Sequence, residues 1–349
     1  MPVERQLAAM RAALSDWYRT NARTLPWRAP PGAPNSPSAR LDPYRVWLSE
    51  IMLQQTTVAA VAPYFAKFTA RWPTLADLAD ADPDDVLAAW AGLGYYSRAR
   101  NLIACAVVVV RDHGGAFPAD EAALRSLPGI GDYTAAAIAG IAFAITDAVP
   151  VDANIERVVA RLFAIATPLP AGRAAIRAAA RALWPIDGSG GDFAQAMMDL
   201  GSTLCTSRSA DCGACALHDY CKGRKQGIAL SLPVKPAKKP KPVRQGRATW
   251  IGREDDVWLV RRPDKGMLGG MRALPGSDWG ESLVAAPPRS SAAGQLRHVF
   301  THFALDLSVD VADDISLAVG EGEWWPIDRL DEAGLPTLYR RAAAVALGE

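Results

Sequence analysis

Long apolar runs are missing from this sequence. The longest, residues 135–145, has 11 residues, which is too few for a helix that spans a membrane. The first residues, MPVERQLAAM, lack the apolar core of a secretory signal. Cysteine is scarce, with five in 349 residues, whereas hydrophobic residues make up an ordinary 50%. These features exclude a membrane protein, a secreted disulfide scaffold and a disordered chain, and we expect a cytoplasmic protein.

The net charge is also small, at +1, but it is unevenly distributed. Residues 201–250 carry ten Lys and Arg against two Asp and Glu, whereas residues 301–349 carry three against ten. Any basic surface that binds nucleic acid would therefore be local. Arginine supplies 30 of the 38 basic residues, which suits bidentate phosphate contacts, although a compositional bias of the genome explains it equally well.

The spacing of apolar residues divides the chain into parts, and its length favours two or three domains. Up to about residue 226 the spacing is helical, and a proline-rich stretch at residues 29–41 predicts a surface loop. Residues 227–246 alternate Pro and Lys, which predicts an extended linker. Beyond it we expect an α+β domain, with strands at 248–251, 257–261, 298–310 and 323–326 and a helix at 337–347.

Four of the five cysteines lie close together, in the spacing C-x6-C-x2-C-x5-C: Cys205, Cys212, Cys215 and Cys221. Zinc would take four sulfurs, but zinc ribbons usually present two distant C-x2-C pairs. An iron–sulfur cluster needs four thiolates on one compact loop, which suits this spacing better. Disulfides are the weakest interpretation, since no secretion signal is seen. Cys105 stands alone in an apolar run, which is typical of a core residue.

This spacing resembles the cluster loop of the helix-hairpin-helix DNA glycosylases, the superfamily of endonuclease III and the MutY-type adenine glycosylases. The resemblance implies a [4Fe-4S] cluster that is structural and redox-active, on a loop that faces the DNA backbone. It also implies a mainly α-helical glycosylase domain over residues 1–226, with a six-helix part at about 42–150 and a cluster-bearing part formed by 1–41 and 151–226. The basic residues beside the cysteines fit this role: Arg208, Lys222, Arg224 and Lys225.

A second match is LPGIGDYTAAAI, residues 127–138, which resembles the hairpin pattern LPG(V/I)G-x-x-TA of these glycosylases. Gly129 and Gly131 permit a tight turn, and the amide N–H groups at the following helix start would bind a DNA phosphate. In the endonuclease III enzymes that also cut the strand, a Schiff-base lysine lies two residues after the second glycine. This chain has Tyr133 there, which predicts a monofunctional glycosylase.

Asp152 lies in VPVDANIERVV at the start of a predicted helix, where Asp commonly serves as an N-cap. A carboxylate at a helix start would also stay ionised at little cost and would stabilise a cationic sugar. The segment resembles the family motif V-D-G-N-V-x-R-V, with Ala153 in place of glycine. The resemblance implies that Asp152 is the catalytic aspartate and that Asn154 holds the backbone or the attacking water.

Glu50 lies in WLSEIMLQQT, where a helix would surround it with apolar side chains and so raise its pKa. A lone Glu on a helix usually faces solvent, but this segment closely resembles the MutY-type signature, in which the glutamate is the proton donor. Breaking the N-glycosidic bond of adenosine requires protonation of the base and stabilisation of the sugar cation. We expect Glu50 to protonate adenine N7 and then activate water, with Asp152 and Tyr133 supporting the cation and the acid.

An enzyme that acts on a base within a duplex must extrude the base and fill the gap. GLGYYSRARN, residues 92–101, offers Leu93 and Tyr95 as wedge and stacking groups, with core packing as the alternative. Trp27 and Arg28, in LPWR, resemble the residues that contact the flipped adenine. Three residues that follow the catalytic segment are further candidates for DNA contact: Gln54, Gln55 and Thr56.

Residues 247–349 resemble the MutT-like (Nudix-fold) domain of adenine glycosylases, most closely in VWLVRRPDKGMLGGMRALPG, residues 257–276. The acidic signature of Nudix hydrolases is missing, so we expect no nucleotide hydrolysis. In QLRHVFTHFAL the resemblance assigns 8-oxoguanine recognition to Phe300, Thr301 and His302, with Thr301 in place of a serine. The alternative is that these histidines belong to an ordinary edge strand.

Taken with the resemblance, the sequence predicts a monomeric, monofunctional DNA glycosylase of base excision repair that removes adenine mispaired with 8-oxoguanine or guanine in duplex DNA. In a bacterium it would associate with the nucleoid, and no membrane partner is expected. Two alternatives stay open. A glycosylase for mismatched thymine or another base is opposed by Glu50 and the C-terminal domain. A non-catalytic protein that binds damaged DNA is opposed by the pair Glu50 and Asp152.

Overall fold

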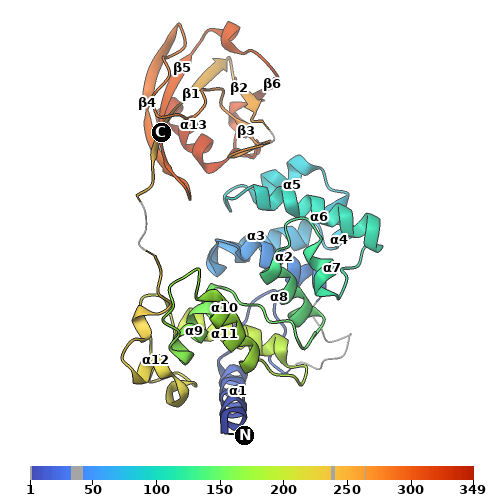
Figure 1. Ribbon diagram of the computed structural model, residues 1–349. Helices are drawn as coiled ribbons and strands as arrows, with labels where there is room; N and C mark the ends of the chain where they lie inside the picture. Colours follow the sequence, from blue (N-terminus) through green and yellow to red (C-terminus); the bar gives the residue numbers. More distant parts are fainter. Residues whose placement is uncertain (1, 33–41, 237–239, 264) are drawn as a thin grey trace. The chain divides into compact units, whose positions relative to one another are not determined.

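The computed structural model describes residues 2–32, 42–236, 240–263 and 265–349 (Figure 1). Contacts between Cα atoms divide the chain into two compact units, Met1–Ala79 with Ala104–Ala237 and Asp80–Ile103 with Lys238–Glu349. Within the described residues, no helix is both long and apolar enough to cross a membrane. Most of the predicted proline-rich loop, residues 33–41, lies outside the described residues.

The first part of the chain is helical, as the apolar spacing predicts. Several helices begin where a side chain accepts hydrogen bonds from the free N–H groups of the first turn, as Asp42 does from Tyr44 N at 2.9 Å. The helices are α1 (Pro2–Asn21), α2 (Pro43–Leu53), α3 (Val58–Arg71), α4 (Leu75–Ala79), α5 (Pro83–Trp90), α6 (Ser97–His113), α7 (Glu121–Arg125), α8 (Asp132–Ala142), α9 (Ala153–Phe163), α10 (Arg173–Leu183), α11 (Gly190–Thr203) and α12 (Lys222–Lys225).

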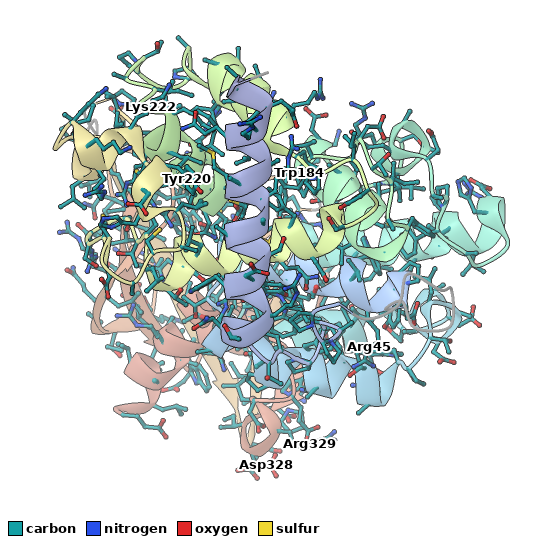
Figure 2. The ribbon with its side chains drawn as sticks, turned by 90° about the horizontal axis from the view of Figure 1, so that it is seen from below. Arg45, Trp184, Tyr220, Lys222, Asp328 and Arg329 are labelled. Carbon is teal, nitrogen blue, oxygen red and sulfur yellow. The ribbon has the colours of Figure 1, made fainter. Side chains whose placement is uncertain are left out.

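Helix α8 explains the longest apolar run, because it is buried from Thr134 to Gly140 and contacts α2, α7 and α11. A second core joins α1, α9, α10 and α11 through side chains such as Leu14, Val159 and Met197. Trp184, directly after α10, belongs to this core and meets Phe193 of α11 edge to face, with ring centroids 5.1 Å apart (Figure 2 labels Trp184). Since α9 packs on both α10 and α11, this core fixes the start of α9 beside the rest of the helical unit.

The C-terminal residues form a mixed sheet with the order β3-β2-β1-β5-β4, in which β6 also pairs with β2. β1 and β5 are parallel, and the other pairs are antiparallel. Helix α13 (Thr337–Leu347) packs on β4 and β5 over a core that includes Leu305, Leu307 and Leu338. The strands are β1 (Val243–Arg253), β2 (Asp256–Arg261), β3 (Arg272–Ala273), β4 (Ser290–Val299), β5 (Ala304–Ala312) and β6 (Gly322–Pro326).

Two expectations for this part need correction. The single strand predicted at 298–310 is wrong, because β4 and β5 are separate antiparallel strands joined by a turn. Apolar residues continue through that turn, where Phe300 and Phe303 pack on Trp279, so the alternating pattern does not mark the break. The predicted linker is also partly structured, since Val234 O accepts a hydrogen bond from Leu169 N at 2.9 Å and β1 already begins at Val243. The predicted helix at 337–347 has the observed bounds.

Candidate active site

Glu50 on α2 is a carboxyl group in an apolar setting. It is 7% exposed and lies between buried residues such as Trp47 and Ile51. Burial raises the pKa of Glu50 from 4.5 to about 7, as its apolar neighbours predict. Tyr133, in the first turn of α8, donates a hydrogen bond to Glu50 Oε2 at 2.7 Å, and this bond opposes the effect of burial by favouring the ionised form. Near neutral pH, Glu50 is therefore able both to donate and to accept a proton.

Asp152 is the N-cap of α9, and both of its oxygens accept hydrogen bonds. Ile155 N donates to Oδ1 at 2.7 Å, and Asn154 Nδ2 donates to Oδ2 at 2.7 Å. Burial nevertheless raises the pKa of Asp152, and the two hydrogen bonds act in the opposite direction. This differs from the expectation that a helix start keeps the carboxylate ionised at little cost. The charge of Asp152 also raises the pKa of Glu50 and of Tyr133, so the three groups form one electrostatic cluster.

Asn154 connects this cluster to the cysteine segment. Its Oδ1 accepts a hydrogen bond from Arg157 Nη2 at 2.8 Å, and Arg157 Nε donates to Cys205 O at 2.7 Å. The close approach of α9 to α11 requires Gly201, because a Cβ there would lie 2.7 Å from Asn154 Cβ. The orientation of Asp152 is therefore set by packing against α11 and by the backbone of the cysteine segment.

Trp27 and Arg28 lie in the segment between α1 and α2. Trp27 is buried and meets Phe65 edge to face, with ring centroids 5.2 Å apart. Arg28 Nη1 donates to Asp199 Oδ1 at 2.7 Å. The positive charge of Arg28 lowers the pKa of Glu50 and of Tyr133, so its guanidinium belongs to the same electrostatic cluster as the candidate acid.

Two polar residues of α11 were missed by the sequence reasoning. Asp199 is fully buried and accepts hydrogen bonds from Arg28 and from the backbone and side chain of Arg23. Gln195 is 5% exposed, and its Oε1 has no hydrogen-bond partner among the described residues. A buried acceptor without a partner is costly, which makes Gln195 a candidate for ligand contact. Both residues are polar and interrupt the apolar segment FAQAMMDLG, and this interruption is the feature of the sequence that could have identified them.

The hairpin turn forms where the sequence predicts it. Gly129 has a φ of +76°, which favours glycine, and Gly131 is the N-cap of α8, with no side-chain cap. At the end of α2, Gln54 Nε2 donates to Thr134 Oγ1 at 3.4 Å, so Gln54 lies beside the first turn of α8. Gln55 is exposed with a φ of +60°, and Thr56 Oγ1 donates to Gln54 O at 3.2 Å.

Leu93 and Tyr95 lie on the turn between α5 and α6, where Gly92, Gly94 and Tyr95 all have positive φ angles. Tyr95 is 45% exposed. Leu93 is only 7% exposed, so in this structure it packs in the core, which is the alternative to a wedge role. Arg98 Nη2 donates to the carbonyl oxygens of Leu93 at 3.1 Å and Gly94 at 3.2 Å, which fixes the turn. A wedge role for Leu93 would require it to leave this packing.

Phe300, Thr301 and His302 form the turn between β4 and β5. The Phe300 ring stacks on Trp279 with centroids 5.4 Å apart, while Thr301 and His302 are exposed. The turn lines a hollow of about 510 Å³. The hydroxyl groups of Thr301 and Tyr95 form a hydrogen bond of 2.7 Å. The three predicted residues therefore present polar and aromatic groups together on one surface.

The four clustered cysteines line one small cavity of about 30 Å³, and all are free thiols. Arg161 Nη1 donates to Cys205 Sγ at 3.2 Å, a contact that stabilises a thiolate. Among the described residues, no three His, Cys, Asp or Glu side chains converge closely enough to hold a single metal ion. The four cysteines line this cavity together, and four thiolates on one compact segment fit a polynuclear cluster with one cysteine per iron. Cys105 is buried apart from them.

Comparison with known proteins identifies the family and relatives of this chain. Residues 48–185 match the family described as HhH-GPD superfamily base excision DNA repair protein, and residues 248–344 match the NUDIX domain. The chain is similar to the adenine DNA glycosylase of Homo sapiens, at 33% identity over 99% of this chain and 75% of that protein. It is also similar to the adenine DNA glycosylase of Mycolicibacterium smegmatis, at 41% identity over 62% of this chain and 69% of that protein.

A thermostable thymine-DNA glycosylase is a structural neighbour. It superposes with a TM-score of 0.55 and 26% identity, over 65% of this chain and 100% of that chain. The two family matches confirm the predicted fold class, a helical helix-hairpin-helix glycosylase domain followed by a MutT-like (Nudix-fold) domain.

Proposed function

This chain belongs to the adenine DNA glycosylases of the helix-hairpin-helix superfamily, and from that premise we propose that it excises adenine mispaired with 8-oxoguanine or guanine in duplex DNA. It is a DNA glycosylase of base excision repair. The mispair specificity, the roles of individual residues and the cofactor are parts of the proposal. The observation that carries it furthest is the hydrogen bond between Tyr133 and Glu50 in the cluster that includes Asp152.

The chemistry assigned to Glu50 begins with proton donation. With a pKa of about 7, a large fraction of Glu50 is protonated at neutral pH, and the carboxylic acid transfers its proton to adenine N7. The bond between C1′ and N9 then breaks, and its electron pair leaves with the base. The Glu50 carboxylate that remains accepts a proton from the water that attacks C1′, which restores the acid.

Asp152 is assigned to the sugar cation that this bond cleavage produces. Its oxygens are fixed by Ile155 N and Asn154, so the carboxylate does not need to reorient as positive charge develops. Glu50 and Asp152 thus have separate tasks. Glu50 has a pKa of about 7 and can exchange a proton, whereas Asp152 accepts two hydrogen bonds that favour its ionised form.

Tyr133 supports the proposal that the enzyme is monofunctional. Its hydroxyl is bound to Glu50, and a phenol cannot form the Schiff base that a lysine forms with the opened sugar. Base release would therefore leave an intact strand with an abasic site.

The remaining predicted residues divide between the base and the DNA. We assign the flipped adenine to Trp27 and Arg28, together with Gln195, whose free Oε1 is suited to accept from an exocyclic amine. Recognition of 8-oxoguanine is assigned to the turn formed by Phe300, Thr301 and His302. DNA contact is assigned to seven further residues: Gln54, Gln55, Thr56, Leu93, Tyr95, Gly129 and Gly131.

We further propose that the four clustered cysteines hold a [4Fe-4S] cluster, which when bound supplies a structural and redox-active centre. Cys205 joins it to the catalytic residues, since its carbonyl oxygen accepts from Arg157. The proposed organisation places catalysis in residues 1–226, lesion recognition in residues 247–349, and a monomer on the DNA.

The test is single-turnover excision from duplexes with one 8-oxoguanine·adenine, guanine·adenine or guanine·thymine pair, followed by alkali to cut abasic sites. Wild type should release adenine but not thymine, and Glu50→Gln, which keeps the shape but not the transferable proton, should release neither while still binding. Glu321→Gln, at an exposed site, is the matched control and should behave as wild type. Adenine release by Glu50→Gln would reassign the proton donor, and thymine release would change the substrate.

A further inference from the structure

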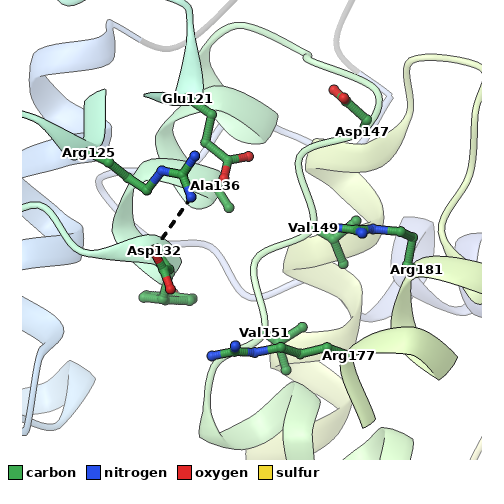
Figure 3. A pocket seen from close by; sticks show the side chains of 10 residues that line it. Glu121, Arg125, Asp132, Ala136, Asp147, Val149, Val151, Arg177 and Arg181 are labelled. Carbon is green, nitrogen blue, oxygen red and sulfur yellow. Dashed lines mark ion pairs between the residues drawn. The ribbon is translucent and has the colours of Figure 1, made fainter. Parts of the chain in front are cut away.

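A hollow of about 230 Å³ lies beside Tyr133, between the start of α8 and one face of α10 (Figure 3). Tyr133 reaches both this hollow and Glu50, so the hollow adjoins the candidate active site. A second hollow of about 190 Å³ is lined by Asp152 and Ala153, and Arg177 of α10 lines both. Arg177 therefore borders both the hollow that Tyr133 lines and the hollow that Asp152 lines.

Arg177 belongs to a row of arginines on α10, at Arg173, Arg177 and Arg181, where a spacing of four places them on one helix face. Arg173 pairs with Glu156 at 3.1 Å. Arg177 and Arg181 are exposed, and among the described residues neither side chain has a hydrogen bond or an ion pair. Like charges at this spacing repel one another, so the face favours an anionic ligand.

The hollow beside Tyr133 is electrostatically polarised. Glu121 and Asp147 lie toward one end, whereas Arg177 lies at the other end beside Val151, and its side chain extends from α10 into the hollow (Figure 3). Arg125 is paired with Asp132 at 3.7 Å, which leaves it less available to a ligand. Arg181 stands between these ends, beside Val149 and nearer to Asp147 (Figure 3). An anion would therefore bind at Arg177 first and at Arg181 more weakly.

We propose that Arg177 binds a phosphate of the DNA strand that carries the excised adenine, at the nucleotide whose sugar faces Asp152. This inference rests on the proposed function. A sugar that reacts beside Asp152 brings its own two phosphates into the neighbouring space, and a phosphate near the acidic groups Glu50 and Asp152 requires a cation to offset their repulsion. Arg177 supplies that cation and has no ion pair within the described part of the chain to break, and a guanidinium binds phosphate bidentately.

The experiment measures how binding of the full-length protein depends on salt. The probe is a duplex with 8-oxoguanine opposite 2′-fluoro-2′-deoxyadenosine, whose glycosidic bond resists cleavage. Each phosphate contact contributes a slope of about −0.9 to log K against log salt. Arg177→Gln should therefore make the slope shallower by about one, so that the wild-type advantage in affinity shrinks about three- to fourfold between 50 and 200 mM salt. Arg181→Gln should have a smaller effect.

The matched control is Arg19→Gln, which removes the same charge from an exposed site on α1 where Arg19 pairs with Asp16 at 2.5 Å. Its slope should equal that of wild type. An unchanged slope in Arg177→Gln, or an equal change in Arg19→Gln, would overturn the phosphate contact. Wild-type excision of adenine alongside such a result would leave the proposed function intact, whereas failure of wild type to excise would count against the proposed function itself.

Discussion

The hydroxyl of Tyr133 donates a hydrogen bond to Glu50 Oε2 at 2.7 Å, which links the first turn of α8 to the last turn of α2 across 83 positions of sequence. Burial favours the protonated carboxyl and this bond favours the ionised one, and the pKa of Glu50 comes to about 7. Burial is thus the main cause of the raised pKa of Glu50, and Tyr133, at the position of the Schiff-base lysine in the resembled lyases, limits the increase.

We expect the single-turnover rate of wild type to fall as the pH rises above about 7, because Glu50 must be protonated to act as the acid. Tyr133→Phe removes a bond that stabilises the ionised form, so the pKa of Glu50 should rise and the fall should move to higher pH. The measurement is the pH–rate profile of both proteins. Tyr44→Phe, which removes a hydroxyl bound to Trp72 O instead, is the control. A shift to lower pH would contradict this reading of the bond.

Glu50 should also destabilise the folded protein at high pH. Its pKa is raised in the folded state, so the folded protein binds more protons and its stability falls as the pH rises from 4.5 through about 7. The full effect corresponds to roughly 3 kcal/mol above pH 7 and vanishes well below 4.5. Glu50→Gln should therefore unfold at a higher temperature than wild type at pH 8, with a smaller difference at pH 5. Equal differences at both pH values would show that Glu50 does not titrate in this range.

Borohydride should trap little covalent complex between wild type and an 8-oxoguanine·adenine duplex, because Tyr133 offers no amine at the sugar. Tyr133→Lys should lose the bond to Glu50 but gain some trapping and strand cleavage. Denaturing electrophoresis after reduction measures both. Efficient trapping by wild type would indicate that another lysine attacks the sugar.

If the clustered cysteines hold an iron–sulfur cluster, the purified protein should be brown and should absorb broadly at about 400 nm. Cys212→Ser should lose iron, sulfide and colour together, because each thiolate binds one iron. Cys105→Ala is the matched control, since Cys105 is buried outside the cluster cavity and its loss should leave the colour unchanged. Zinc in place of iron, found by metal analysis of protein purified without oxygen, would contradict the assignment.

Replacing Thr301 and His302 by alanine in the full chain should reduce the preference for 8-oxoguanine over guanine opposite adenine. A direct base contact contributes about 1–3 kcal/mol, so the preference should fall roughly ten- to a hundredfold. Both residues are exposed, so the fold should tolerate the change. Single-turnover rates on the two duplexes measure it, and the guanine·adenine rate, which should stay the same, is the internal control. An unchanged preference would move lesion recognition to another segment.

Much of this protein was determined by local sequence. The helix at 337–347, the tight turn at Gly129 and the capping of α9 by Asp152 follow from patterns of a few neighbouring residues, because caps, turns and amphipathic helices depend on local hydrogen bonds and spacing. The break between β4 and β5 did not follow, since Phe300 and Phe303 continue the apolar alternation and are held in the turn by the distant Trp279.

The candidate site shows the same division. WLSEIMLQQT and VPVDANIERVV identify Glu50 and Asp152 as candidates, but neither segment contains Tyr133, whose hydrogen bond opposes the effect of burial on the pKa of Glu50. The sequence assigned no role to Asp199 or Gln195, because both depend on burial in the folded helical unit. Asp199 also depends on its ion pairs with Arg23 and Arg28, which lie far away in the sequence. The residue types were decided by the sequence. The pKa of Glu50, the orientation of Asp152 and the position of Arg177 in the hollow that Asp152 lines were decided by tertiary packing, since burial and long-range contacts exist only in the folded chain.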